Sequence, residues 1–162
     1  MANKNVDTRE LDALVERFAR AGGIIDTVID PFLKDMGDWG VLESQKEILN
    51  AGAVDTNELI QEMHWVIEDV SDGIQVVIRP SDKADEYAWY VEEGSPPHSA
   101  PIEALRPWAE RHGIPVGAVW YKIKTEGTDP RKMFYITFGL FQHEVDQRTP
   151  AFIGEIARRL VE

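Results

Sequence analysis

The hydrophobic pattern of this chain changes period after Ala51-Gly52-Ala53, and this change constrains its fold more than any other feature. Before that point, apolar residues recur at the spacing of one face of an α-helix. From Met63 onward, apolar and polar residues alternate, as in a half-buried strand. Ser71-Asp72-Gly73 then supplies a turn with glycine at a position suited to positive φ, and Ile74 to Ile78 returns as the partner strand. Helices followed by a small sheet indicate an α+β fold.

Two helical regions are expected before the sheet. The first is capped by Asp7 or Thr8 and ends at Gly22-Gly23. Its apolar face consists of Leu11, Leu14, Val15 and Phe18. The second runs from about Ile24 to Asn50, where Pro31 marks a kink or a fresh start, so we expect two helices there, or three. Glycines weaken its middle, at Gly37 and Gly40.

The sheet is followed by further helices and one more strand. Asp55 or Thr56 caps a short turn before the first hairpin strand, and Pro80 to Glu86 is a polar loop. The later elements are a helix over Ile102 to Arg111, a helix from Val116 to near Gly127, a central buried strand over Met133 to Phe141, and a last helix that begins at Thr149-Pro150.

These elements predict a single α+β domain over residues 1–162. Residues 1–22 form an N-terminal helical extension and residues 23–162 form the α+β core. The fold has N-terminal helices, a small, mainly antiparallel sheet with packed helices, and a C-terminal helix.

Composition excludes several classes of function. The net charge of −12 argues against sequence-specific nucleic-acid binding, because the Lys and Arg residues are dispersed among more numerous carboxylates. The absence of cysteine excludes disulfides and thiolate zinc sites. No apolar run approaches the roughly 20 residues that span a bilayer, and the N-terminus lacks a secretory signal. We therefore expect a soluble intracellular protein with no membrane partner.

No motif points to catalysis, a cofactor or a metal. The chain lacks glycine-rich phosphate loops, and Ser95 precedes a proline rather than sitting in a nucleophile elbow. No two of the four histidines have the helical spacing of a zinc site, although His143-Glu144-Val145-Asp146 could approach an ion. Adjacent carboxylates are common in a chain with 29 acidic residues. We expect no catalytic, cofactor-binding or metal-binding residues.

An aromatic segment followed by a proline-rich loop is the strongest candidate for an interface. Tyr and Trp are enriched at the buried centres of protein contacts. In an extended segment, consecutive aromatic residues point to alternate faces, so one core cannot bury Tyr87, Trp89 and Tyr90 together. The loop from Gly94 to Pro101 is then a natural arm toward a neighbouring subunit. The predicted subunit-interface residues are Tyr87, Trp89, Tyr90, Glu92, Gly94, Pro96, Pro97 and His98.

The order of these segments resembles the neck or tail-completion proteins of long-tailed double-stranded DNA bacteriophages. Matching segments are Val54-Asp55-Thr56-Asn57-Glu58-Leu59, with Asn57 where the family has glycine, and Tyr87-Ala88-Trp89-Tyr90-Val91-Glu92-Glu93-Gly94-Ser95, with Ser95 in place of threonine. Gly127-Thr128 and Thr149-Pro150-Ala151-Phe152 follow. The similarity consists of short matches over roughly residues 24–162, and Asp129 to Arg148 is longer than the family's usual step from Gly-Thr to Pro-aromatic.

The resemblance implies a structural virion protein, not an enzyme, that joins the DNA-filled head to the tail. It would be a subunit of a homo-oligomeric ring at the head–tail junction, assembled in the host cytoplasm. Its partners would be other neck, connector or tail-tube proteins, with DNA passing non-specifically through the lumen. A ring of heterologous contacts needs two different patches per subunit. The aromatic segment and its proline loop could supply one, and the N-terminal or C-terminal helix the other.

Two alternatives remain open at this point. One is a tail-terminator ring protein, and the other is a small acidic hydrolase or ligand-binding domain that uses the region of His98 and Glu92. Under the joining hypothesis, Trp89→Ala or Gly94→Val leaves the fold soluble and reduces head–tail joining.

Overall fold

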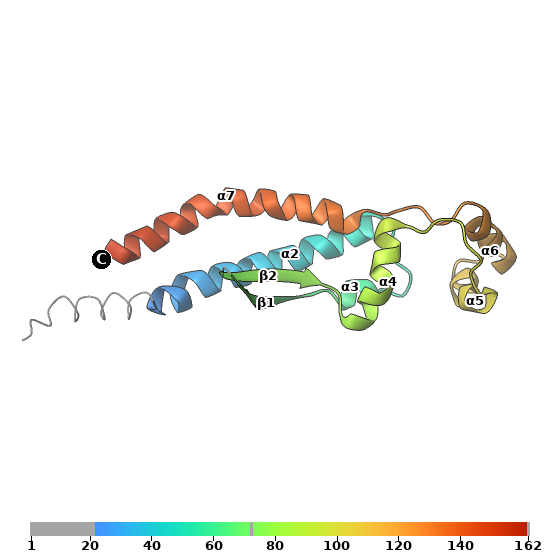
Figure 1. Cartoon of the computed structure of the whole chain (residues 1–162), viewed down its shortest axis with the longest axis horizontal. Coiled ribbons are helices and arrows are strands. Elements are labelled where there is room, and N and C mark those ends of the chain that lie inside the picture. The colour runs from blue at the N-terminus through green and yellow to red at the C-terminus, as the bar shows by residue number, and fades with distance from the viewer. Residues whose placement is uncertain (1–21, 72, 162) are drawn as a thin grey trace, which may run out of the picture. The chain divides into compact units, whose positions relative to one another are not determined.

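The computed structural model describes residues 22–71 and 73–161 and shows an α+β fold with one two-stranded antiparallel sheet (Figure 1). The elements are η1 (Ile25–Ile29, a π-helical turn), α2 (Asp30–Asn50), α3 (Glu58–Gln61), β1 (His64–Val70), β2 (Gly73–Arg79), α4 (Asp82–Glu93), α5 (Ile102–Arg111), α6 (Val116–Thr125) and α7 (Met133–Val161). The described residues form two compact units, one of residues 22–36 with 142–161 and one of residues 37–141, each described by itself below.

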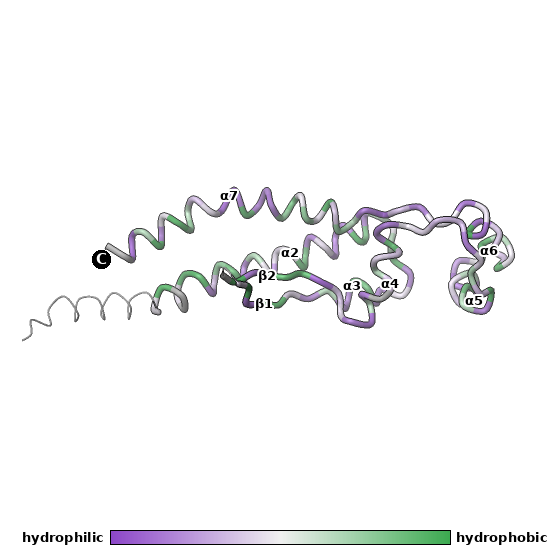
Figure 2. The backbone as a smooth tube through the Cα atoms, in the orientation of Figure 1, coloured by the Kyte–Doolittle hydropathy of each residue, from purple (hydrophilic) through white to green (hydrophobic). Residues whose placement is uncertain are grey.

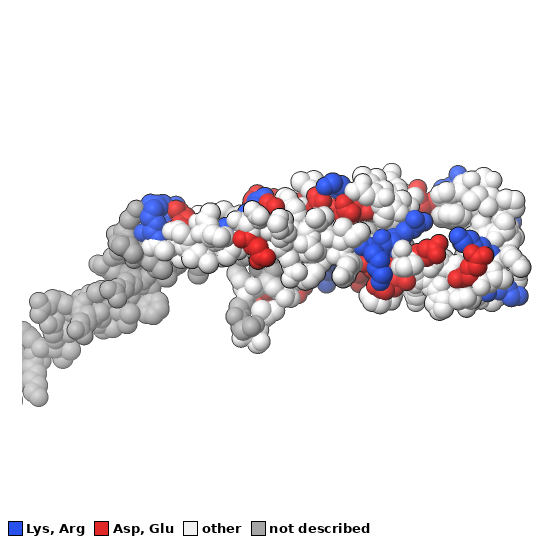
Figure 3. Space-filling model, turned by 90° about the horizontal axis from the view of Figure 1, so that it is seen from above, with Lys and Arg blue, Asp and Glu red and all other residues white. Residues whose placement is uncertain are grey.

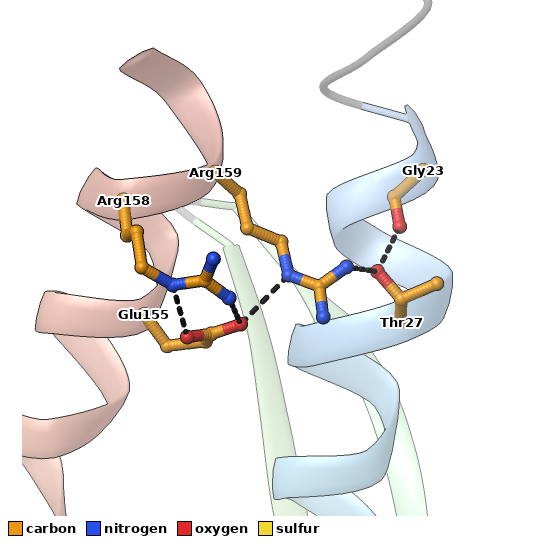
Figure 4. A network of polar contacts seen from close by, with 5 residues as sticks. All are labelled: Gly23, Thr27, Glu155, Arg158 and Arg159. Atoms are coloured by element: carbon orange, nitrogen blue, oxygen red, sulfur yellow. Dashed lines mark hydrogen bonds and ion pairs between the residues drawn. The ribbon is translucent and has the colours of Figure 1, made fainter. Parts of the chain in front are cut away.

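The first unit is helical and packs the start of α2 against the end of α7. The rings of Phe32 and Phe152 stack with their centroids 4.1 Å apart. Arg159 of α7 donates to the Glu155 carboxylate at 2.7 Å and to the Thr27 hydroxyl of η1 at 3.3 Å, while Arg158 donates to the same carboxylate (Figure 4). These contacts join two segments that are far apart in the sequence.

Two expectations about helix ends in this unit are corrected. Residues 22–24 are helical and lead into η1, so Gly22-Gly23 does not end the helical backbone there. The rest of the expected first helix, from Asp7 onward, lies outside the described residues. Thr149-Pro150 does not start the last helix but lies inside α7, where the Thr149 hydroxyl donates to the Val145 carbonyl oxygen.

In the second unit, the hairpin packs on α2 at two glycines. Trp65 of β1 pairs with Ile78 of β2, and the strands connect at Val70↔Gly73, as the turn predicts. A Cβ at Gly37 would overlap the Trp65 ring, and one at Gly40 would overlap Ile78. α2 continues through both glycines, which therefore admit the sheet rather than break the helix. η1 passes directly into α2 at Asp30, so the helical backbone changes type just before Pro31 and does not start afresh there.

The core of the second unit lies between α2, α3, α4 and the start of α7. Its fully or nearly fully buried members are Ile48, Leu59, Met63, Ala84, Ala88 and Met133. Figure 2 shows hydrophobic residues along the strands and the first turns of α7. The expected helix over Ile102 to Arg111 and the next one from Val116 are both confirmed.

Two segments differ in kind from their predictions. The expected polar loop from Pro80 to Glu86 is mostly the first half of α4, which begins at Asp82 and continues through the aromatic segment. The expected central strand over Met133 to Phe141 is the start of α7, although its aromatic and β-branched content favours a strand. A helical aromatic segment places Ala84 and Ala88 in the core and leaves Trp89 and Tyr90 66% and 63% exposed.

Candidate functional site

Two short segments that carry the resemblance meet in the second unit. Ser95 and Thr128 form an antiparallel bridge in which the Ser95 amide donates to the Thr128 carbonyl at 3.1 Å and the Thr128 amide donates back at 2.9 Å. Their hydroxyl oxygens lie 3.0 Å apart. We call residues 94–95 with residues 127–128 the Gly-Ser/Gly-Thr pair.

The two glycines of this pair have no room for a side chain. Gly94 has φ +69° and Gly127 has φ +80°, which are conformations that L-residues rarely adopt. A Cβ at Gly94 would overlap the carbonyl oxygen of Thr128, and a Cβ at Gly127 would overlap that of Ser95. The pairing of the two backbones therefore requires glycine on both sides.

A carboxylate of α4 caps α7 directly beside this pair. The Glu92 oxygens accept the backbone N–H groups of Phe134 and Tyr135, each at 2.9 Å. Glu92 is buried, with 6% of its surface exposed. The first N–H groups of a helix lack intrahelical partners, and a carboxylate at that end also interacts favourably with the helix dipole. Glu92 therefore explains why α7 begins where it does.

An apolar groove of about 1370 Å³ lies beside the Gly-Ser/Gly-Thr pair. It is bordered by α3 and α4 on one side and by the α5–α6 hairpin on the other, and the space-filling view shows charged side chains around a hollow in this region (Figure 3). Its lining includes Val54, Tyr90, Leu105, Trp108, Val119 and Arg131. We call this feature the groove.

An ion pair crosses the groove. Arg111 of α5 donates to both carboxylate oxygens of Asp55, with its Nε 2.8 Å from Oδ1. This hydrogen bond from Arg111 lowers the pKa of Asp55 and raises that of Arg111. His112 stacks on Trp108 with ring centroids 4.1 Å apart. The contact that holds α5 to the loop before α3 is therefore an ion pair, although most of the groove lining is apolar.

The structure places the predicted interface residues in different environments. Tyr87, Tyr90, Pro96 and His98 line the groove. Trp89 is exposed and absent from the groove lining, and Pro97 is exposed. Gly94 belongs to the Gly-Ser/Gly-Thr pair, and Glu92 is occupied as the cap of α7. The proline loop is held to α6 by the His98 amide, which donates to the Ile123 carbonyl at 3.2 Å.

Several residues of the site carried no sequence signal. Asp55 and Arg111 are 56 positions apart, and neither belongs to a motif that predicts their pairing. Neither Asp55 nor Thr56 caps α3 as expected, because Asn57 occupies the N-cap position with φ +62°. Asn is one of the few residues besides glycine that adopt positive φ. Arg131 follows Gly127-Thr128 closely and lines the groove, but its position in the chain alone does not indicate that role.

The candidates for acid–base or metal chemistry are not brought together. Within residues 22–71 and 73–161, no three His, Asp or Glu side chains are grouped to hold a metal ion. His98 Nδ1 lies 2.9 Å from the Pro96 carbonyl, and the Glu92 carboxylate accepts from the α7 backbone, so these two side chains have separate partners. Glu144 pairs with Arg148 at 2.6 Å.

Among the described helices, none combines the length and apolar content needed to cross a membrane. Comparison with protein-family models, with curated proteins and with solved structures finds no match to this chain.

Proposed function

We propose that this chain is a structural virion protein of the phage neck, which joins the DNA-filled head to the tail as a ring subunit. The observation that carries the proposal is the Gly-Ser/Gly-Thr pair. It brings together the two segments, Tyr87 to Ser95 and Gly127-Thr128, on which the resemblance depends. Their mutual contact gives a structural reason for both segments to keep glycine followed by a small hydroxyl residue.

After this pair the chain departs from the resemblance, because Thr149-Pro150-Ala151-Phe152 lies inside α7 and not before a last helix. The closing helix begins at Met133, so only Asp129–Lys132 separate it from Gly127-Thr128. The long stretch from Asp129 to Arg148, which departs from the family's usual short step in the sequence, is mostly part of that helix.

An exposed aromatic surface suits a joining role. Trp89 lies one helical turn before Glu92, which caps α7 at Tyr135. Tyr135 and Phe138, on the first turns of α7, are 75% and 61% exposed. Aromatic residues are enriched at the centres of protein contacts, and a contiguous exposed apolar patch marks such a contact. We call Trp89, Tyr135 and Phe138 the aromatic surface, and we propose that it contacts other neck, connector or tail-tube proteins.

The charge of the chain is compatible with a ring that DNA passes through. A net charge of −12 repels phosphate, so a lumen of this chain would let DNA slide without binding. The proposed protein has no catalytic step.

Complementation with single variants tests the role of the aromatic surface. We expect Trp89→Ala, supplied to a phage whose own copy of this reading frame is inactivated, to fold but to reduce infectious yield. The matched control is Tyr121→Ala on α6, because Tyr121 is 65% exposed and lies outside the aromatic surface. Equal, normal yields from both variants would contradict the proposed contact. Gly94→Val is unsuitable here, since it would break the Gly-Ser/Gly-Thr pair and thus the fold.

A further inference from the structure

The groove is larger than a usual small-molecule site. Ligand pockets commonly measure roughly 300–1,000 Å³. The volume here is about 1370 Å³. Its lining is mainly apolar and includes Val54, Leu59, Val91, Leu105, Val119 and Ile123. A long apolar groove between helices suits the apolar face of an amphipathic helix.

Three Lys or Arg side chains and three carboxylates line the groove, and among the described residues one of these cations has no carboxylate partner. The three carboxylates already have cationic partners, because Asp55 pairs with Arg111, Glu58 with Lys83, and Asp129 with Lys122 at 3.9 Å. Arg131 donates to the Ala51 carbonyl at 3.1 Å and has no carboxylate partner within the part of the chain that the structure describes. A helix with carboxylates beside its apolar face would supply that partner.

The chain contains such a segment before its first described residue. The sequence predicts an amphipathic helix from Asp7 to Phe18, with the apolar face named above. Asp7, Glu10, Asp12 and Glu16 lie among these residues, against only Arg9 and Arg17. The segment therefore combines the two properties that suit the groove, an apolar face and carboxylates beside it.

We propose that the groove binds residues 7–18 of a neighbouring copy of this chain. This inference rests on the proposed ring, in which each subunit needs two different complementary patches. The groove is one patch and the N-terminal segment is the other. The aromatic surface lies outside this contact and stays available for other proteins of the neck.

Paired substitutions in the full chain test both patches by light scattering after size-exclusion chromatography. In the helix that the sequence predicts, Leu14→Asp places a charge on the apolar face, whereas the adjacent Ala13→Asp places it on the opposite face. Tyr90→Asp alters the groove, whereas Tyr121→Asp alters a similarly exposed tyrosine outside its lining. We expect the wild type and both controls to self-associate, and Leu14→Asp and Tyr90→Asp to weaken association by at least about tenfold. A wild type that stays monomeric, or controls that fail equally, would overturn the inference.

Mixing the two defective chains gives the sharper result. The Leu14→Asp chain keeps an intact groove, and the Tyr90→Asp chain keeps an intact N-terminal segment. Each is expected to be monomeric alone, and the mixture is expected to form a one-to-one dimer that grows no further. A mixture that remains monomeric contradicts a heterologous contact between these two patches.

A peptide of residues 7–18 tests the identity of the occupant directly, because the peptide itself carries the unaltered N-terminal segment. Fluorescence anisotropy should show that the labelled peptide binds the full Leu14→Asp chain, and that Arg131→Glu in that chain weakens binding by about tenfold or more. Failure of the peptide to bind, or equal binding to both chains, rejects residues 7–18 as the occupant. These outcomes are independent of head–tail joining, so normal infectious yield with Trp89→Ala would reject the proposed function while leaving the groove contact standing.

Discussion

Ser95 and Thr128 lie 33 positions apart and are joined by two backbone hydrogen bonds and by hydroxyl oxygens 3.0 Å apart. The segment between them contains α5 and α6, and the bridge between Ser95 and Thr128 brings the two ends of this segment together. The pair therefore fixes where the α5–α6 hairpin meets α4, and with it one wall of the groove.

Substitution of glycine at this pair should destabilise the second unit. Gly127→Ala combines an unfavourable φ with overlap of the Ser95 carbonyl, so we expect a loss of about 2–4 kcal/mol in the free energy of unfolding. Gly113→Ala is the control, since Gly113 also has positive φ but has open space around it. It should cost only about 1 kcal/mol. If a urea titration showed equal losses of unfolding free energy in the two variants, the close approach of Gly127 to the Ser95 carbonyl would not contribute to stability.

Removal of the Glu92 carboxylate should loosen the start of α7. Glu92→Ala leaves the partly buried N–H groups of Phe134 and Tyr135 without their side-chain acceptor, which should cost about 1–3 kcal/mol in stability. Glu93→Ala removes only a partly exposed ion pair with Lys132 and should cost less than about 1 kcal/mol. Hydrogen exchange at residues 134–137 should accelerate in the first variant and not in the second. Similar exchange in both would contradict the capping role.

Two glycine-to-alanine changes in helices should have opposite effects on stability. Gly40→Ala inserts a methyl group against Ile78 and should destabilise the packing of the sheet on α2 by about 1–3 kcal/mol. Gly139→Ala in α7 meets open space and should stabilise the helix by up to about 1 kcal/mol. The thermal unfolding temperature of each variant, compared with that of the wild type, shows whether the change destabilises or stabilises the protein. A stabilising Gly40→Ala would mean that Ile78 does not approach α2.

The carboxyl group of Glu155 should titrate unusually low. Hydrogen bonds from Arg158 and then Arg159 lower its pKa from 4.5 to about 2. Because the folded pKa is depressed, the contribution to stability is present above about pH 4.5 and is lost as the pH falls through about 2. A carbon-detected NMR titration should place this pKa near 2 in the wild type and higher in Arg158→Gln, with Lys34→Gln as an unchanged control. A wild-type value near 4.5 would contradict the network.

Local signals predicted the hairpin and the α5–α6 region well. Ser71-Asp72-Gly73 between alternating segments predicts the turn of the hairpin, although Gly73 is already the first residue of β2, and Gly113 with Pro115 separates α5 from α6. The start of α4 also has a local signal that the prediction of a polar loop overlooked. Ser81 stands at its N-cap position, and Asp82 and Asp85 lie in its first turn.

The identity of α7 as a helix depends on contacts that are remote in sequence. Its first residues have the composition of a buried strand, and the carboxylate that caps them comes from Glu92, 42 positions before Phe134. Likewise, four of the predicted interface residues share the groove only because α4 is helical and the proline loop is held to α6. No local pattern in the sequence indicates that Arg111 pairs with Asp55 across the groove.

Electron microscopy of a lysate in which this reading frame is inactivated in its parent genome tests the central claim most directly. The proposed role predicts separate DNA-filled heads and finished tails, with joining restored by the wild-type chain. Heads with normal tails attached would contradict the joining function, and tails of irregular length would indicate a terminator instead.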